Sequence, residues 1–230
     1  MSIRIHISNI QYEILSDIKK TFYKINIKDM CITLPFFIGK SIKNHCEPQN
    51  TISKLIFKGT LHKIQKEKEQ EILWTLNKYY TCILSMPPGF GKTVLLCKII
   101  TKLDLKTCIL VSTFLEALCW EKMIEKLTNA KVWIVHDKYP PSEYDICICL
   151  PTLYKKIPKE IRNNIGLLII SEVHKFYTQK HFKILLSFHP KYLIAESCTP
   201  QSSTQSHDIL NSLCGNIFIT EKELDLNIGG

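Results

Sequence analysis

Short apolar runs alternate with longer amphipathic runs from Thr81 onward, and this alternation constrains the fold more than any other feature. Several of the short runs are apolar at every position, which is typical of strands that are covered on both faces. We predict strands at residues 82–86, 107–112, 131–135, 145–150, 166–171, 192–197 and 216–220. We predict helices at residues 92–102, 115–127, 152–160, 178–188 and 205–213. The alternation therefore predicts an α/β fold in which helices cover both faces of a mostly parallel sheet.

Residues 1–60 follow a different pattern from the rest of the chain. Isoleucine recurs at alternate positions 3, 5 and 7, residues 11–22 have the spacing of a helix, and residues 46–51 are irregular. We therefore predict a small N-terminal accessory segment at 1–60, an α/β domain at 61–220 and a short tail at 221–230.

The composition of the 230 residues excludes several classes of protein. Apolar residues make up 45% of the chain, which is enough to build a core and excludes disorder. The apolar runs, such as 165–170, are far shorter than the roughly 18 residues that a membrane-spanning helix needs. The first 20 residues lack the uninterrupted apolar core of a secretory signal. We expect a cytoplasmic protein with no membrane partner.

The ten cysteines point to the same compartment. Most stand singly inside apolar runs and none forms a C-x-x-C pair, so we expect reduced, buried thiols rather than disulfides or zinc ligands.

The net charge of +9 is unevenly distributed along the chain. Residues 1–70 hold 12 basic against 6 acidic side chains, whereas residues 71–230 hold 18 against 15. A basic N-terminal third is suited to the phosphates of nucleic acid. Because 28 of the 30 basic residues are lysine, a general lysine bias explains the charge equally well.

A glycine-rich loop, SMPPGFGKT at residues 85–93, separates a predicted strand from a predicted helix. Glycines let successive backbone N–H groups turn toward a phosphate, and the following helix adds the positive end of its dipole. The loop predicts an ATP site in which Lys92 reaches the β- and γ-phosphates and Thr93 binds Mg²⁺. The predicted ATP contacts are Met86, Pro87, Pro88, Gly89, Phe90, Gly91, Lys92 and Thr93. Met86 replaces the first glycine of the strict pattern, so an ordinary turn before a helix is the alternative.

A second motif, Ser171-Glu172-Val173-His174, stands at the end of the strand predicted at 166–171. The order of the two motifs resembles the first motor domain of superfamily-two helicases of the DEAD/DEAH type, in which the strand ends in Asp-Glu-x-His. The resemblance implies that Glu172 orients and deprotonates the attacking water, and that Lys92 and His174 belong to the same catalytic group. Ser171 replaces the Asp, so as a Mg²⁺ contact it can only bind a metal-held water and supplies no charge.

Three further segments fall in the order expected of this family. Residues 110–120 and 149–153 resemble segments that contact nucleic-acid phosphates, which implies that Thr113 and Thr152 contact DNA or RNA. Residues 197–200 resemble the Ser/Thr-Ala-Thr-Pro segment, which implies that Ser197 and Thr199 couple ATP hydrolysis to nucleic-acid binding. A threonine that only caps a helix is the alternative for the nucleic-acid contacts.

Gln65 lies where many family members carry a glutamine that reads adenine, and its amide can both donate to and accept from an adenine edge. Gln70 is a second candidate for this contact. A solvated glutamine on a charged helix is the alternative to both.

The resemblance implies a RecA-like P-loop NTPase lobe at 61–220, with 221–230 as the start of an interlobe linker. Among relatives, the chain looks like helicases of large cytoplasmic DNA viruses, of the poxvirus transcript-release type, which would place it in host cytoplasm or virion. Such motors close two lobes on ATP, and arginine fingers of the second lobe stabilise the γ-phosphate charge. The sequence contains only Arg4 and Arg162, so we expect the second lobe to lie in a longer chain or in a partner.

The leading prediction is therefore the ATP-binding lobe of a helicase that couples ATP hydrolysis to remodelling of DNA or RNA. Ser171 and the missing arginine fingers favour, as the alternative, a non-catalytic module that binds nucleotide or nucleic acid together with a partner. A small-molecule kinase built on the same loop would need a lid with arginine or lysine fingers, and arginine is nearly absent.

Overall fold

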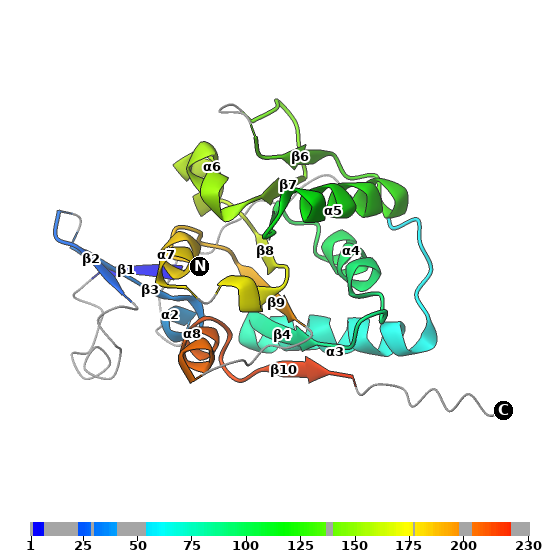
Figure 1. Cartoon of the computed structure of the whole chain (residues 1–230), viewed down its shortest axis with the longest axis horizontal. Coiled ribbons are helices and arrows are strands. Elements are labelled where there is room, and N and C mark those ends of the chain that lie inside the picture. Colours follow the sequence, from blue (N-terminus) through cyan, green and yellow to red (C-terminus); the bar gives the residue numbers. More distant parts are fainter. Residues whose placement is uncertain are drawn as a thin grey trace.

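The computed structural model describes residues 2–6, 23–28, 30–40, 54–136, 140–176, 178–197 and 204–221, and these residues form two sheets (Figure 1). The larger sheet has the strand order β10-β4-β9-β8-β5-β7-β6, and every neighbouring pair in it is parallel. Its strands are β4 (Thr81–Ser85), β5 (Thr107–Leu110), β6 (Val132–Ile134), β7 (Ile146–Cys149), β8 (Leu167–Ile170), β9 (Tyr192–Ser197) and β10 (Phe218–Thr220). The predicted α/β fold is confirmed, and each predicted strand is present.

Helices cover both faces of this sheet (Figure 1). The first layer comprises α3 (Lys63–Tyr79), α4 (Lys92–Leu103) and α5 (Phe114–Leu127), and the second includes α7 (Gln179–Leu185) and α8 (Thr204–Cys214). In β8, Leu167 and Ile169 pack with the first layer, whereas Leu168 and Ile170 pack with the second. Successive side chains of a strand point to opposite faces, which explains why these strands are apolar at every position.

The helix predicted at 152–160 is wrong in its extent. The chain forms a 3₁₀ helix, η3 (Pro151–Lys156), and then a short helix α6 (Lys159–Asn163). Between them Ile157 is extended, with φ −78° and ψ 118°, because it precedes Pro158. Proline therefore divides a segment whose apolar spacing alone suggests one helix.

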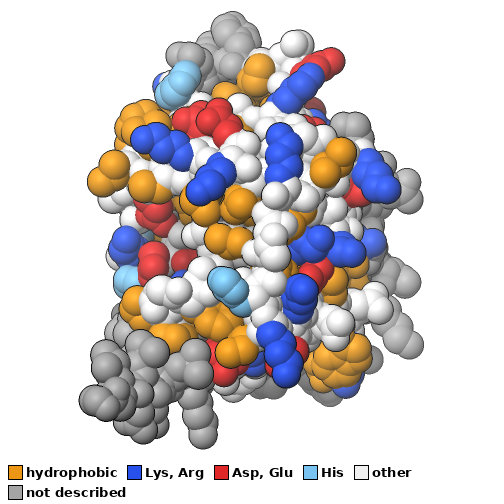
Figure 2. All heavy atoms as spheres, turned by 90° about the vertical axis from the view of Figure 1, so that its right-hand side faces the viewer, with side chains coloured by type: hydrophobic (Ala, Val, Ile, Leu, Met, Phe, Trp, Pro, Cys, Tyr) orange, Lys and Arg blue, Asp and Glu red, His pale blue; other side chains and the backbone are white. Residues whose placement is uncertain are grey.

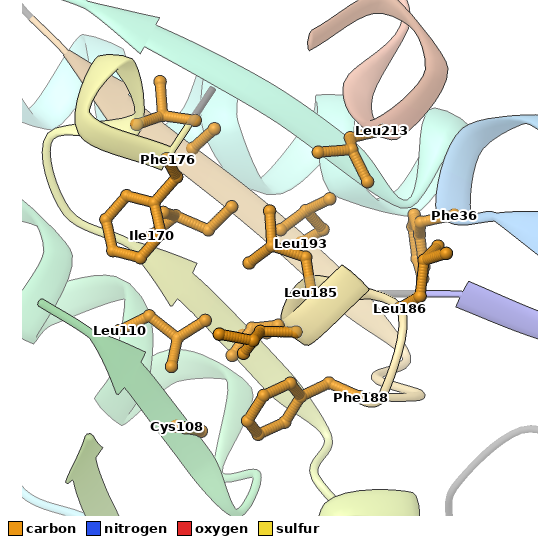
Figure 3. Close-up of a cluster of buried hydrophobic side chains, with 14 of the residues drawn as sticks. Phe36, Cys108, Leu110, Ile170, Phe176, Leu185, Leu186, Phe188, Leu193 and Leu213 are labelled. Carbon is orange, nitrogen blue, oxygen red and sulfur yellow. The ribbon is translucent and has the colours of Figure 1, made fainter. Parts of the chain in front are cut away.

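The N-terminal segment packs against the second helical layer. Strands β1 (Ser2–His6), β2 (Lys24–Asn26) and β3 (Cys31–Pro35) form an antiparallel sheet, and α2 (Phe36–Lys40) follows directly. Four of its buried side chains join the hydrophobic cluster that lies under α7 and α8: Ile3, Ile32, Leu34 and Phe36. Figure 3 shows Phe36 at one side of this cluster, which also contains Leu186. The alternating residues around Ile3 lie in strand β1, whereas the features predicted at 11–22 and 46–51 lie outside the described residues.

Residues 54–60 run along the first helical layer and are fixed to it by backbone hydrogen bonds. The Leu55 N–H donates to Asp104 Oδ1 at 2.8 Å, the Ile56 N–H to Asn129 Oδ1 at 2.7 Å, and the Lys58 N–H to the Leu127 carbonyl at 2.7 Å. Leu55 is buried in the same cluster as α4 and α5.

Eight cysteines lie in the described part of the chain; all are free thiols, and six of them are buried. Burial raises the pKa of Cys97 and of Cys214 to about 12, so these thiols stay protonated and pack as small apolar groups. Where the structure describes the chain, no helix combines the length and apolar character that a bilayer crossing requires.

Candidate functional site

A cavity of about 620 Å³ opens at the carboxyl edge of the parallel sheet, and we call it the Lys92 cavity. Open α/β sheets bind ligands at this edge. Its walls come from the loop after β4, the start of α5 and the ends of β8 and β9. Its lining residues are Gly89, Gly91, Lys92, Thr93, Thr113, Leu115, Glu116, Cys119, Trp120, Met123, Ser171, Glu172, Lys175 and Glu196. The structure thus brings together both motifs that the sequence singles out.

The glycines of the loop are required by its backbone. Gly89 and Gly91 have φ values of +80° and +82°, a region that side chains other than glycine rarely adopt. A Cβ on Gly91 would also lie 2.6 Å from Gln65 Nε2, whereas a Cβ on Gly89 would meet open space. Lys92 begins α4 and folds back over the loop, where its Nζ donates to the Met86 carbonyl at 3.1 Å and to the Pro87 carbonyl at 3.3 Å.

Gln65 contacts this loop through a hydrogen bond to its backbone. Its Nε2 donates to the Phe90 carbonyl at 2.9 Å, and its Oε1 accepts the His62 N–H at 3.0 Å. The side chain is buried. Gln70 lies apart from the loop and lines a different cavity, beside Phe57 and the lysines of α4. Of the two glutamines, Gln65 is therefore the one in contact with the loop, and its contact with adenine stays a prediction.

The residues after β8 project toward the cavity from a strained backbone. Glu172 has φ +52°, a left-handed conformation that costs a residue with a side chain about 1–2 kcal/mol. Its Oε2 lies 3.3 Å from His174 Nδ1, and the same ring nitrogen lies 2.9 Å from Ser197 Oγ at the end of β9. Ser171 is buried and its Oγ accepts the indole N–H of Trp120 at 3.4 Å. The motif after β8 and Ser197 thus form one connected group, while Thr199 lies outside the described residues.

Thr113 and Thr152 follow the carboxyl ends of the adjacent strands β5 and β7. Thr113 lines the Lys92 cavity and caps α5, because its Oγ1 accepts the Glu116 N–H at 3.2 Å. Thr152 is exposed on η3 and does not line that cavity. Their role in nucleic-acid binding stays a prediction.

Figure 2 shows a face of the molecule on which basic side chains are interspersed with acidic and apolar ones.

Glu196 is a cavity residue that the sequence motifs do not predict. Its side chain is 4% exposed, and its Oε2 has no hydrogen-bond partner among the residues that the structure describes. Burial raises the pKa of this carboxyl to about 7; Lys92 opposes the shift, and Glu172 and Glu116 add to it. The available signal in the sequence was an acidic residue in a strand that is apolar before it, at the end of the strand where the predicted motifs lie.

Two solved structures illustrate the fold. The SWI2/SNF2 ATPase core of Sulfolobus solfataricus, solved in complex with dsDNA, superposes with a TM-score of 0.60 over 72% of this chain and 38% of its own, at 17% identity. The UvsW helicase of bacteriophage T4 gives a TM-score of 0.56 over 74% of this chain and 64% of its own, at 14% identity. The fold is therefore that of a RecA-like helicase lobe.

Sequence comparison assigns the family. Residues 58–202, more than half of the chain, match the model of the family described as "Type III restriction enzyme, res subunit", and the chain belongs to this family. It is 32% identical over 169 residues to "Putative helicase 109L" of Invertebrate iridescent virus 3, covering 69% of this chain and 51% of that protein. It is 29% identical to "Putative helicase 161L" of Invertebrate iridescent virus 6, covering 96% and 54%. The resemblance to the first lobe of a viral superfamily-two helicase is confirmed, and the chain spans about half the length of these relatives.

Proposed function

We propose that the chain is the ATP-binding lobe of a nucleic-acid helicase or translocase, in which ATP occupies the Lys92 cavity. The observation that carries this proposal is that one cavity unites Lys92 and Thr93 with Glu172, although about 80 residues separate the two motifs. The left-handed glycines and the start of α4 supply backbone N–H groups for phosphate, and Lys92 supplies a positive charge.

Glu172 is the proposed general base for the water that attacks the γ-phosphate. Its strained backbone carries the carboxylate into the cavity, and His174 fixes one of its oxygens. Because the same His174 nitrogen contacts Ser197, a shift of Ser197 would reach Glu172 through this ring. We assign the coupling role of Ser197 to this contact.

The residues present also fit a magnesium ion, because the cavity holds two hydroxyls and two buried carboxylate oxygens, Glu196 Oε2 and Glu116 Oε1, without a hydrogen-bond partner among the described residues. The Thr93 hydroxyl would bind the ion, and the Ser171 hydroxyl would hold a water bound to it. A bound Mg²⁺ neutralises phosphate charge and thereby favours phosphoryl transfer.

The proposed second ligand is DNA or RNA, which would contact Thr113 and Thr152 beyond β5 and β7. The Sulfolobus solfataricus neighbour was solved in complex with dsDNA, which supports DNA as one candidate. The second lobe, from a longer chain or a partner, would complete both sites.

Replacing Lys92 with alanine is expected to weaken the binding of fluorescent ADP by at least about tenfold, because the phosphates lose their charged partner. Lys98→Ala on the same helix is the matched control, since Lys98 lines a different cavity. Equal affinities of the wild type and Lys92→Ala, by fluorescence titration, would exclude nucleotide from this loop.

A non-catalytic module is the second candidate, favoured by the neutral Ser171 and by the absence of arginine from the lining of the Lys92 cavity, as far as the structure describes it. The two functions differ in ATP hydrolysis. Turnover that single-stranded DNA or RNA stimulates would support the motor, whereas nucleotide binding without turnover, even with the second lobe present, would support the module.

A further inference from the structure

We propose that Glu196 supplies the negative charge that holds the divalent cation of a bound nucleotide, in place of a carboxylate at the position of Ser171. This inference rests on the proposed nucleotide site. It assigns a metal contact to a strand, β9, from which the sequence motifs predict none.

The strand register places Glu196 where such a contact is needed. Strand β9 lies between β4, which leads into the loop, and β8, which ends before Ser171. Ile170 pairs with Ala195, so the next positions along the two parallel strands are Ser171 and Glu196. Ile169 and Ile194, two residues earlier, both pack with the layer that contains α4. Because side chains alternate along a strand, Ser171 and Glu196 face the same layer.

The burial of Glu196 calls for a ligand. A carboxylate that is 4% exposed loses most of its hydration, and its Oε2 finds no hydrogen bond among the described residues to replace it. Two more carboxylates, Glu116 and Glu172, line the same cavity and repel it. Lys92 is the cation that attracts it, and the proposed phosphates would compete for that lysine.

The chemistry of the surroundings favours magnesium. The described residues contain no group of three or more His, Cys, Asp or Glu side chains that could hold a metal ion by themselves. Mg²⁺ does not require such a cage, because it commonly uses one or two carboxylates, keeps several waters and takes further oxygens from substrate phosphates. Glu196 and the Thr93 hydroxyl match this ligand set, and the Ser171 hydroxyl can hold one of the metal-bound waters. The second methylene of glutamate also gives it reach across the cavity.

The test compares the affinity for fluorescent ADP in EDTA with that in excess Mg²⁺, by equilibrium titration of the full chain. For the wild type we expect Mg²⁺ to tighten binding by at least about tenfold. Glu196→Gln should lose this gain and should bind ADP in EDTA at least as tightly as the wild type, because one carboxylate near the phosphates is gone. The double variant Ser171→Asp/Glu196→Gln should recover the gain, because it moves the carboxylate to the neighbouring strand.

Glu116→Gln tests the rival carboxylate of the same cavity: Glu116 Oε1 is also buried without a hydrogen-bond partner among the described residues, whereas its Oε2 accepts hydrogen bonds from the Ser112 N–H and hydroxyl. Its Mg²⁺ gain should equal that of the wild type. If Glu196→Gln keeps the full Mg²⁺ gain while Lys92→Ala abolishes ADP binding, the metal assignment is wrong and the nucleotide site stands. If the wild type binds no ADP under either condition, both proposals fall.

Discussion

Replacing Phe36 with alanine is expected to lower the free energy of unfolding by about 3–5 kcal/mol, the usual cost of removing a buried phenylalanine ring. Phe36 belongs to the N-terminal accessory segment, yet its side chain is fully buried. It lies in one cluster with Leu186 and Leu213 of the α/β lobe (Figure 3). The cavity left by the ring would therefore open inside the core of the lobe.

Urea unfolding followed by tryptophan fluorescence measures this effect, since Trp74, Trp120 and Trp133 all lie in the lobe. Ile25→Ala in β2 is the control, because Ile25 is 49% exposed and its loss should change stability by less than about 0.5 kcal/mol. We expect Phe36→Ala to unfold in a single transition, at a lower urea concentration than the wild type. A Phe36→Ala protein whose tryptophan transition matches the wild type would show that the segment unfolds independently.

This packing changes how the basic N-terminal third should be tested. Deleting residues 1–60 would remove four buried side chains from one cluster and Leu55 from the other, together with the lysines. A loss of nucleic-acid binding would then report damage to the core as much as lost charge. Substitution of exposed lysines such as Lys28, Lys54 and Lys58 separates the two effects.

The strands could be predicted because their signal is local. Runs such as Leu167–Ile170 are apolar throughout, and a strand under two helical layers requires this. The loop at Gly89–Thr93 could be predicted as well, since its positive φ values require glycine. The break between η3 and α6 was harder to predict. Its cause is one proline, Pro158, which interrupts a segment whose apolar spacing suits a single helix.

Glu196 could not be assigned from the chain alone, because its role depends on which strands are neighbours. In the sequence it stands 25 residues from Ser171, next to a segment that resembles a coupling motif. In the sheet the order β4-β9-β8 sets it beside Ser171. The contacts of Gln65 with His62 and Phe90 were hidden for the same reason, since a glutamine suited to adenine is equally suited to backbone groups.

Glu196→Gln is expected to stabilise the protein at pH 8 in EDTA by about 3 kcal/mol. Burial raises the pKa of Glu196 from about 4.5 to about 7 in the folded state, so folding favours the protonated form. The resulting penalty is absent below the unfolded-state pKa, grows as the pH rises through the interval between the two values, and is constant above about 7. Glutamine carries no charge at any pH, so the gain should fall below about 1 kcal/mol at pH 5.

Thermal melts at pH 5 and pH 8 check this sign, and at pH 8 a gain of this size corresponds to several degrees in Tm. Lys92 from α4 attracts the ionised form of Glu196, while Glu172 after β8 and Glu116 on α5 repel it. The pKa of Glu196 therefore reflects burial together with all three of these charges. A variant less stable than the wild type at pH 8 would mean that Lys92 outweighs burial and the two carboxylates. A gain at pH 8 would instead show that this carboxylate is kept at the expense of stability, as expected of a group that is retained to bind a ligand.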